Sequence, residues 1–316
     1  MRKLYRYFPG VLMLAGALAL AGCDDVVSED PPTKPQARPN AMVRAPQPSG
    51  PSEASQDLAR YYQRVENDLV AQGLMRRDGG GVDTPFTDTD LLRNFVQIGF
   101  YEEYQRDKGL LPSQSGPVAI KKWTGPVRIG VEFGRNVPDA IKTSERARVA
   151  AYASRLARVT GHPITVSDAS PNFVVLFMSN DDGAQSRARA LEVIPAIAKS
   201  NLAIITNLPR STQCFVISAG VRSENELGVA LAYIRSELTD LQRLACIHEE
   251  IAQGLGLTND SPRARPSIFN DDEEFALLTT HDEMLLEALY NPALTPGMGL
   301  EEARPILRRL FERGAS

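Results

Sequence analysis

Residues that commonly build metal and nucleotide sites are scarce in this sequence. Only three histidines occur in 316 residues, and no spacing gathers His162, His248 and His281 into a zinc site. A glycine-rich phosphate loop, a dinucleotide-binding fingerprint and a G-x-S-x-G turn are all missing. The sequence therefore carries none of the usual signatures of nucleotide-binding proteins or serine hydrolases.

An excess of positive charge and a membrane-spanning run are missing as well. The formal net charge is -4 and the pI is about 5.6, so we expect no nucleic-acid partner. The apolar stretch from Val11 to Ala21 is shorter than the roughly 20 residues that a spanning helix needs. We therefore interpret this stretch as part of an export signal rather than a transmembrane helix.

Residues 1–22 are typical of such a signal because basic residues precede the apolar stretch. The signal ends in Leu20-Ala21-Gly22-Cys23, which resembles the processing box of bacterial lipoproteins, where the cysteine carries the lipid. We predict a lipid anchor at Cys23 and a place in the cell envelope, on the periplasmic side of the inner or the outer membrane. An ordinary secretory signal cleaved near Ala21 is the alternative.

The remainder of the chain divides into three parts. Residues 23–55 are rich in proline and are predicted to form an extended tether. Residues 56–116 form a helical extension, with helices expected from Ser55 to Gly73 and from about Thr87. Residues 117–316 form the main domain.

The main domain is predicted to have an α+β fold with a mixed sheet and long helices. The expected strands are 127–133, 164–167, 173–178, 214–218 and 229–235. The expected helices are 144–159 and 184–199, the latter with an interruption at Pro195. Residues 173–178 are apolar on both faces, which indicates a central strand. Thr239 is expected to cap a further helix that carries the most informative residues.

Two cysteines remain if Cys23 carries lipid. Cys214 and Cys246 are then an even pair in an oxidising compartment, and we predict that they form a disulfide. Two buried, reduced thiols are the alternative.

The stretch Glu249–Asp260, EEIAQGLGLTND, keeps the frame of a zinc-protease motif. It resembles the metzincin pattern H-E-x-x-H-x-x-G-x-x-H, which combines two histidines one helical turn apart, a glutamate base, a helix-ending glycine and a third histidine. On this resemblance, Glu250 takes the position of the general base and Gly256 that of the glycine. The three metal-ligand positions are taken by Glu249, Gln253 and Asn259.

The resemblance continues beyond this stretch. Leu255-Gly256-Leu257 is similar to the LGL of matrixin-type metzincins, Ser267-Ile268-Phe269 stands where those proteases have a methionine turn, and Leu278–Tyr290 is similar to their final helix. At closer range, EEIAQGLGLTND, SIFND and LYNPALTPGM resemble an uncharacterised proteobacterial lipoprotein family, domain of unknown function twenty-nine twenty-seven. The metzincin resemblance implies a zincin-like sheet, whereas the lipoprotein family implies no established activity or cofactor.

The residues at the ligand positions do not suit zinc, which prefers imidazole and thiolate. Glu249, Gln253 and Asn259 offer one carboxylate and two amide oxygens, which is nearer to a calcium or magnesium set, and Asp260 adds one more oxygen. We predict no metal ligands and no cofactor, with weak binding of a divalent ion as the alternative. His248 is expected to be a core histidine because it lies on the apolar side of its helix.

Three hypotheses about function follow. The preferred one is a lipid-anchored envelope protein whose degenerate metzincin-like domain binds or scaffolds a peptide, a protein or a glycan without cleaving it. The second is a hydrolase that uses Glu250 as general base with an atypical oxygen-ligand site. In the third, Glu249, Gln253 and Asn259 hydrogen-bond one another to hold the final turn, and the protein serves as an envelope scaffold. A helix face that is simply solvated is the alternative to any role for these residues.

Overall fold

The computed structural model describes residues 50–105 and 107–314 of the chain. The predicted export signal, the predicted lipidation site Cys23 and most of the predicted tether lie outside these residues. The described helices and strands are α1 (Glu53–Ala71), α2 (Asp88–Gly99), β1 (Lys122–Trp123), β2 (Val127–Phe133), α3 (Asp139–Thr160), β3 (Ile164–Val166), β4 (Phe173–Met178), α4 (Gly183–Val193), α5 (Lys199–Thr206), β5 (Cys214–Gly220), β6 (Glu226–Arg235), α6 (Asp240–Gly254), α7 (Thr280–Tyr290) and α8 (Leu300–Gly314), with a short 3-10 helix at Asn180–Asp182.

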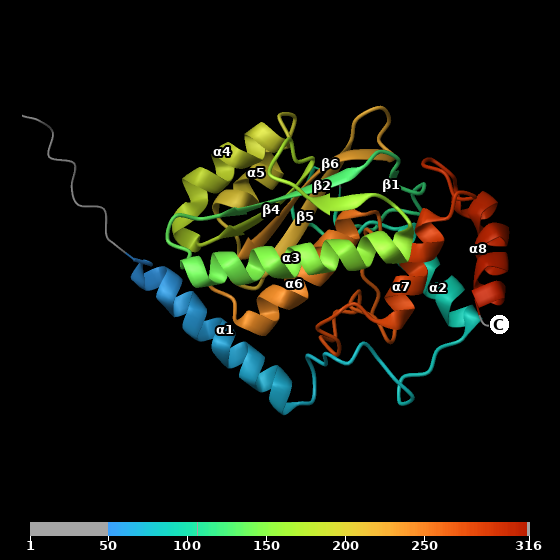
Figure 1. Ribbon diagram of the computed structural model, residues 1–316, viewed down its shortest axis with the longest axis horizontal. Helices are drawn as coiled ribbons and strands as arrows, with labels where there is room; N and C mark the ends of the chain where they lie inside the picture. Colours follow the sequence, from blue (N-terminus) through green and yellow to red (C-terminus); the bar gives the residue numbers. More distant parts are fainter. Residues whose placement is uncertain (1–49, 106, 315–316) are drawn as a thin grey trace, which may run out of the picture. The chain divides into compact units, whose positions relative to one another are not determined.

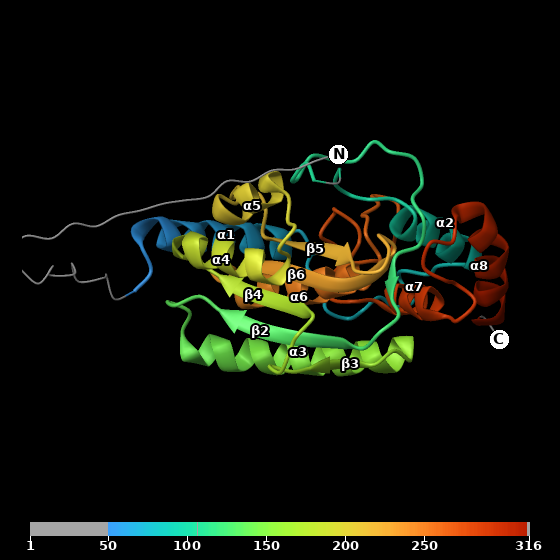
Figure 2. The ribbon, with the colours of Figure 1, turned by 90° about the horizontal axis from the view of Figure 1, so that it is seen from above.

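One mixed sheet of six strands forms the centre of the described region. Its parallel strands lie in the order β3, β2, β4, β6, and the short β1 also pairs with β6 in parallel. The remaining strand, β5, pairs antiparallel with β6, from Cys214 opposite Ile234 to Gly220 opposite Leu227. Figure 2 shows these strands side by side. The predicted α+β class is confirmed, and β5 forms an edge of the sheet.

Helices cover both faces of the sheet. α4 and α5 lie above the strands in Figure 1, while α3 and α6 lie below them. The alternation of β4 explains this arrangement, because Phe173, Val175 and Phe177 contact one hydrophobic cluster and Val174, Leu176 and Met178 contact the other. Every residue of β4 is buried, as a central strand requires.

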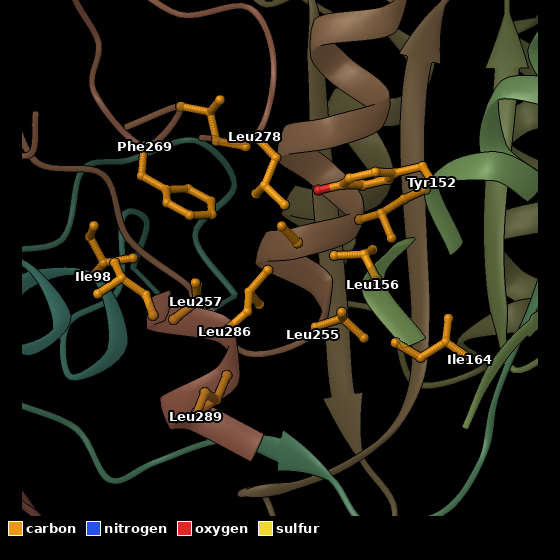
Figure 3. Close-up of a cluster of buried hydrophobic side chains, with 14 of the residues drawn as sticks. Ile98, Tyr152, Leu156, Ile164, Leu255, Leu257, Phe269, Leu278, Leu286 and Leu289 are labelled. Carbon is orange, nitrogen blue, oxygen red and sulfur yellow. The ribbon is translucent and has the colours of Figure 1, made fainter. Parts of the chain in front are cut away.

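The larger hydrophobic cluster joins the sheet to the chain that follows α6. Leu257, Phe269 and Leu286 are fully buried and belong to the same cluster as Tyr152 of α3 (Figure 3). Phe269 occupies the position for which the resemblance implies a methionine turn. The turn before it is held by Asp282, whose carboxylate accepts hydrogen bonds from Ser267 Oγ at 2.6 Å and Ile268 N at 3.0 Å. The segment beyond α6 is therefore a packed part of the core.

The two N-terminal helices share this core. Tyr62 of α1 and Phe95 and Ile98 of α2 belong to the same buried cluster as the sheet residues. Within the described ranges, no helix has both the length and the apolar character needed to cross a membrane.

Several predicted boundaries shift in the structure. The helix predicted from Ser144 begins at Asp139. The helix predicted for 184–199, with its interruption at Pro195, is α4, which ends at Val193, and α5 begins only at Lys199. Three of the helices and strands were not predicted: β1, which has only two residues, α5, which begins where the predicted helix ends, and α8, which places Leu307 and Phe311 in the core.

Candidate functional site

Helix α6 carries the motif residues and begins where the sequence predicts. Thr239 Oγ1 accepts a hydrogen bond from Gln242 N, and the Gln242 side chain in turn accepts one from Thr239 N. The apolar stripe of the helix is buried in the core, with Ile247, Ile251 and Leu255 fully inaccessible. Burial of this stripe leaves the face with Glu249 and Gln253 turned away from the core.

His248 has the structural role that its position predicts. It is buried, its Nδ1 accepts a hydrogen bond from Leu278 N at 3.0 Å, and its ring stacks on Tyr152 with the centroids 4.0 Å apart. Burial lowers the pKa of His248 to about 3. The residue is therefore a neutral core histidine that joins α6 to the segment before α7.

The turn after α6 places Asp260, rather than Asn259, beside the helix. Gly256 has a φ of 126°, and a Cβ at this position would lie 2.1 Å from the Lys121 carbonyl oxygen. Beyond it, Gln253 Nε2 donates to Asp260 Oδ1 at 3.1 Å, whereas Asn259 Nδ2 donates to the Gln97 carbonyl at 2.8 Å. The described contacts thus tie Asn259 to the end of α2, and they do not include the mutual hydrogen bonds of the structural hypothesis.

A cavity of about 650 Å³ lies between α6 and the edge strand β5. Glu249, Glu250, Gln253 and Asp260 all line it, but Asn259 does not. Every residue of β5, from Cys214 to Gly220, also lines the cavity. Since successive side chains of a strand point to opposite faces, a lining that includes all seven residues means that the backbone edge of β5 faces the cavity.

The disulfide forms part of the cavity wall. Cys214 of β5 is bonded to Cys246 of α6, with their Cα atoms 6.0 Å apart, as the sequence predicts. Both residues line the cavity, and Cys246 lies one helical turn before Glu249 and Glu250 on α6. The bond therefore holds the edge strand against the helix that carries the carboxylates.

Burial shields the two carboxyl groups of α6, those of Glu249 and Glu250, from solvent. Glu250 is 3% exposed, and its Oε2 makes no hydrogen bond within the described part of the protein. Burial, and then repulsion from Glu103 and Asp260, raises the pKa of Glu250 well above its usual value. The pKa of Glu249 is raised by burial and by Asp260 and Glu250, and that of Asp260 by burial and Glu103. These groups disfavour one another's charge and titrate together.

Sequence reasoning missed the far wall of the cavity. The segment after α2 contributes Glu103 and Tyr104, and the loop before α7 contributes Asp271 and Glu273. Burial raises the pKa of Glu103 to about 7. These residues lie in loops without a periodic pattern, and only the tertiary structure brings them opposite α6. The segment reaches across to α5, where Gly109 N donates to Asn201 Oδ1 at 3.0 Å.

The donor set does not fit the zinc site that the metzincin resemblance implies. Oxygen atoms of Glu249 and Glu250 and the sulfur of Cys214 lie within 4.8 Å of one another. The sulfur, however, belongs to the disulfide and offers no thiolate. Two carboxylates fall short of the three protein ligands of a catalytic zinc site and of the six or more oxygens that calcium takes.

The sequence matches one protein-family model, described as protein of unknown function (DUF2927), over residues 88–309. The chain belongs to this family. The match begins at α2 and reaches into α8, so it includes both the motif helix and the segment that forms the far wall of the cavity. Neither the curated proteins nor the solved structures contain a match to this DUF2927 chain.

Proposed function

We propose that this protein is a lipid-anchored component of the bacterial cell envelope whose cavity binds an extended polypeptide and does not cleave it. The single observation that carries this proposal is the edge strand β5, whose whole length lines the cavity. An extended chain can add itself to such an edge through backbone hydrogen bonds, with its alternate side chains entering pockets on either side.

The arrangement around the cavity supports a metzincin-like frame for this binding site. The antiparallel edge strand β5 borders the cavity on one side, and the helix with the protease-like motif borders it on the other. The disulfide between them keeps the two walls together. A preformed, rigid cleft of this kind lowers the entropy cost of ordering a bound chain.

Loss of the metal ligands supports binding without cleavage. Glu249 and Gln253 replace the first two histidines, and Asn259 is bonded to Gln97 instead of turning toward the cavity. Without a metal ion, peptide hydrolysis lacks the Lewis acid that polarises the carbonyl.

A hydrolase is the second candidate, and one observation favours it. Glu250 is buried, lines the cavity and has a raised pKa, which are properties of a general base. In this alternative, Glu250 would activate a water molecule against a bound peptide bond.

The test is a selection of random nine-residue peptides on the full chain, purified in a nonionic detergent. Peptides that are retained are then synthesised and added at increasing concentration while amide hydrogen exchange is followed. We expect slower exchange for alternate amides of β5 and full recovery of each peptide at its original mass.

Two results would contradict the proposal. Cleaved peptides, with cleavage abolished in Glu250→Gln, would establish the hydrolase. Retained peptides that protect amides elsewhere and leave β5 unchanged would exclude the edge strand as the binding surface.

A further inference from the structure

We propose that the cavity selects peptides with a basic side chain, and that Glu250 and Glu249 together receive its ammonium or guanidinium group. This inference rests on the proposed function and adds the chemical class of the ligand. The residues that carry it come from α6, from the segment after α2 and from the loop before α7.

The charge of the cavity lining is strongly one-sided. Nine carboxylates line it, among them Glu103, Glu249, Glu250 and Asp260. Among the described lining residues, the basic side chain is Lys121, and its ammonium group is already paired with Glu102. Such a surface attracts cationic groups and repels acidic ones, which steers the choice of partner.

One carboxylate oxygen of a cavity-lining residue has no hydrogen-bond partner among the described residues. Glu250 Oε2 is inaccessible and makes no hydrogen bond in the described residues, although Glu250 lines the cavity. A buried carboxylate without a donor costs stability, and most buried polar atoms in proteins are hydrogen-bonded. A donor that arrives with the ligand would satisfy this oxygen.

The position of Glu249 favours a basic side chain over a simple ion. Oxygens of Glu249 and Glu250 lie within 4.8 Å of each other. One guanidinium or ammonium group can bridge this distance by donating a charge-assisted hydrogen bond to each carboxylate. The same two residues supply too few ligands for a tightly held divalent ion. The cavity is also far larger than an ion requires, since it extends along all of β5.

The titration of the cluster agrees with this assignment. Glu249, Glu250 and Asp260 all have raised pKa values because they are buried close to one another. A cation bound among them would lower these pKa values, so its binding must release protons. The affinity is therefore expected to rise with pH over the range in which the carboxyl groups ionise.

The experiment compares peptides and variants in the same assay. The nine-residue peptides retained by the full chain are sequenced, and for each one the basic residue is replaced by glutamine. Affinities are measured by calorimetry in two buffers of different ionisation enthalpy. We expect lysine or arginine to be enriched at one position and its replacement to weaken binding about thirtyfold or more, with proton release in the wild type.

The variants separate a specific pocket from a general negative field. Glu250→Gln and Glu249→Gln should each lower the affinity for the basic peptide by at least about tenfold. Glu287→Gln removes the same charge from an exposed position of α7 outside the cavity lining and should change the affinity less than about threefold. If all three variants lost the same affinity, the peptide would be responding to the overall negative charge of the protein, and the proposed pocket at Glu249 and Glu250 would be wrong.

The remaining outcomes distinguish the two proposals. Peptides that protect β5 but show no enrichment of basic residues would overturn this inference and leave the proposed function standing. A failure to retain any peptide would contradict the proposed function itself. If calcium at 1 mM displaces the peptide in the wild type and binds in its absence, and Glu250→Gln abolishes that binding, the site is an ion site and the inference is wrong.

Discussion

Glu250 and His248 lie two positions apart in α6, and both are buried. Burial shifts the pKa of each residue in the direction that favours its neutral form. The pKa of Glu250 is raised by burial, and that of His248 is lowered to about 3 by burial. At pH values between the unfolded and the folded pKa of Glu250, this residue is more often protonated in the folded state than in the unfolded state. Its contribution to the free energy of unfolding therefore falls as the pH rises through this range. His248 acts in the opposite sense, because its contribution is present above pH 6.5 and is lost as the pH falls toward 3.

Glu250→Gln should therefore stabilise the protein at alkaline pH. Glutamine resembles the protonated carboxyl group and carries no charge, so we expect the free energy of unfolding at pH 8 to increase by about 1–3 kcal/mol. At pH 4.5 the difference should nearly vanish. Urea unfolding at both pH values measures this, and Glu287→Gln at an exposed position of α7 serves as the control that should remain within about 0.5 kcal/mol of the wild type. A Glu250→Gln protein that is less stable at pH 8 would show that the carboxylate has a stabilising partner.

At the level of elements, the turn after α6 decides which side chains reach the cavity. Gly256 allows the chain to leave the helix close to the backbone of Lys121. Four residues later, the Asp260 side chain accepts a hydrogen bond from the Gln253 side chain. The sequence correctly predicted a glycine-dependent turn, but it predicted Asn259 as the residue that faces the helix. The actual direction depends on the Gln97 carbonyl of α2, a contact between residues 162 positions apart.

Gly256→Ala should destabilise the protein more than Gly161→Ala does. Both glycines have positive φ, 126° at Gly256 and 64° at Gly161, but only at Gly256 would the added Cβ collide with another backbone atom. We expect a loss of about 1–2 kcal/mol for Gly161→Ala and a larger loss for Gly256→Ala. Chemical denaturation of the two variants measures the difference, and equal losses would mean that the contact with Lys121 relaxes without cost.

The disulfide between β5 and α6 gives a second prediction at this scale. It closes a loop with a sequence separation of 32 residues, for which the chain-entropy estimate is about 3–4 kcal/mol. The double variant Cys214→Ala, Cys246→Ala should lose stability by about that amount. Denaturation with and without a reductant measures it, since the wild type should approach the variant when reduced.

For the whole molecule, the central prediction concerns its attachment to a membrane. If Cys23 carries acyl chains, each buried methylene contributes about 0.8 kcal/mol to membrane binding, and the protein should sediment with the membrane fraction. Cys23→Ser should move it to the soluble fraction. Fractionation of cells that express either form tests this, and Cys214→Ala with Cys246→Ala is the matched control that should stay with the membrane.

The sequence predicted individual elements well where a regular pattern decides them. β2 and β4 begin and end at the predicted residues, and Thr239 caps α6, because strand alternation and capping are local. α8 was missed, and so was the far wall of the cavity at Glu103 and Tyr104. The wall lies in an irregular loop, and nothing local indicates where such a loop will lie.

By itself, the sequence determined which residues form the core stripes, which helix carries the polar motif and which ligand chemistry is missing from it. These properties depend on residue type and on spacing within one element. Only the tertiary structure decided that Asp260 rather than Asn259 joins the glutamates and that the whole length of the edge strand β5 lines the cavity. It also decided that Glu103, from the segment after α2, lies close enough to raise the pKa of Glu250. Those outcomes depend on long-range packing, because charges that are far apart in the chain raise one another's pKa values only after the fold brings them together.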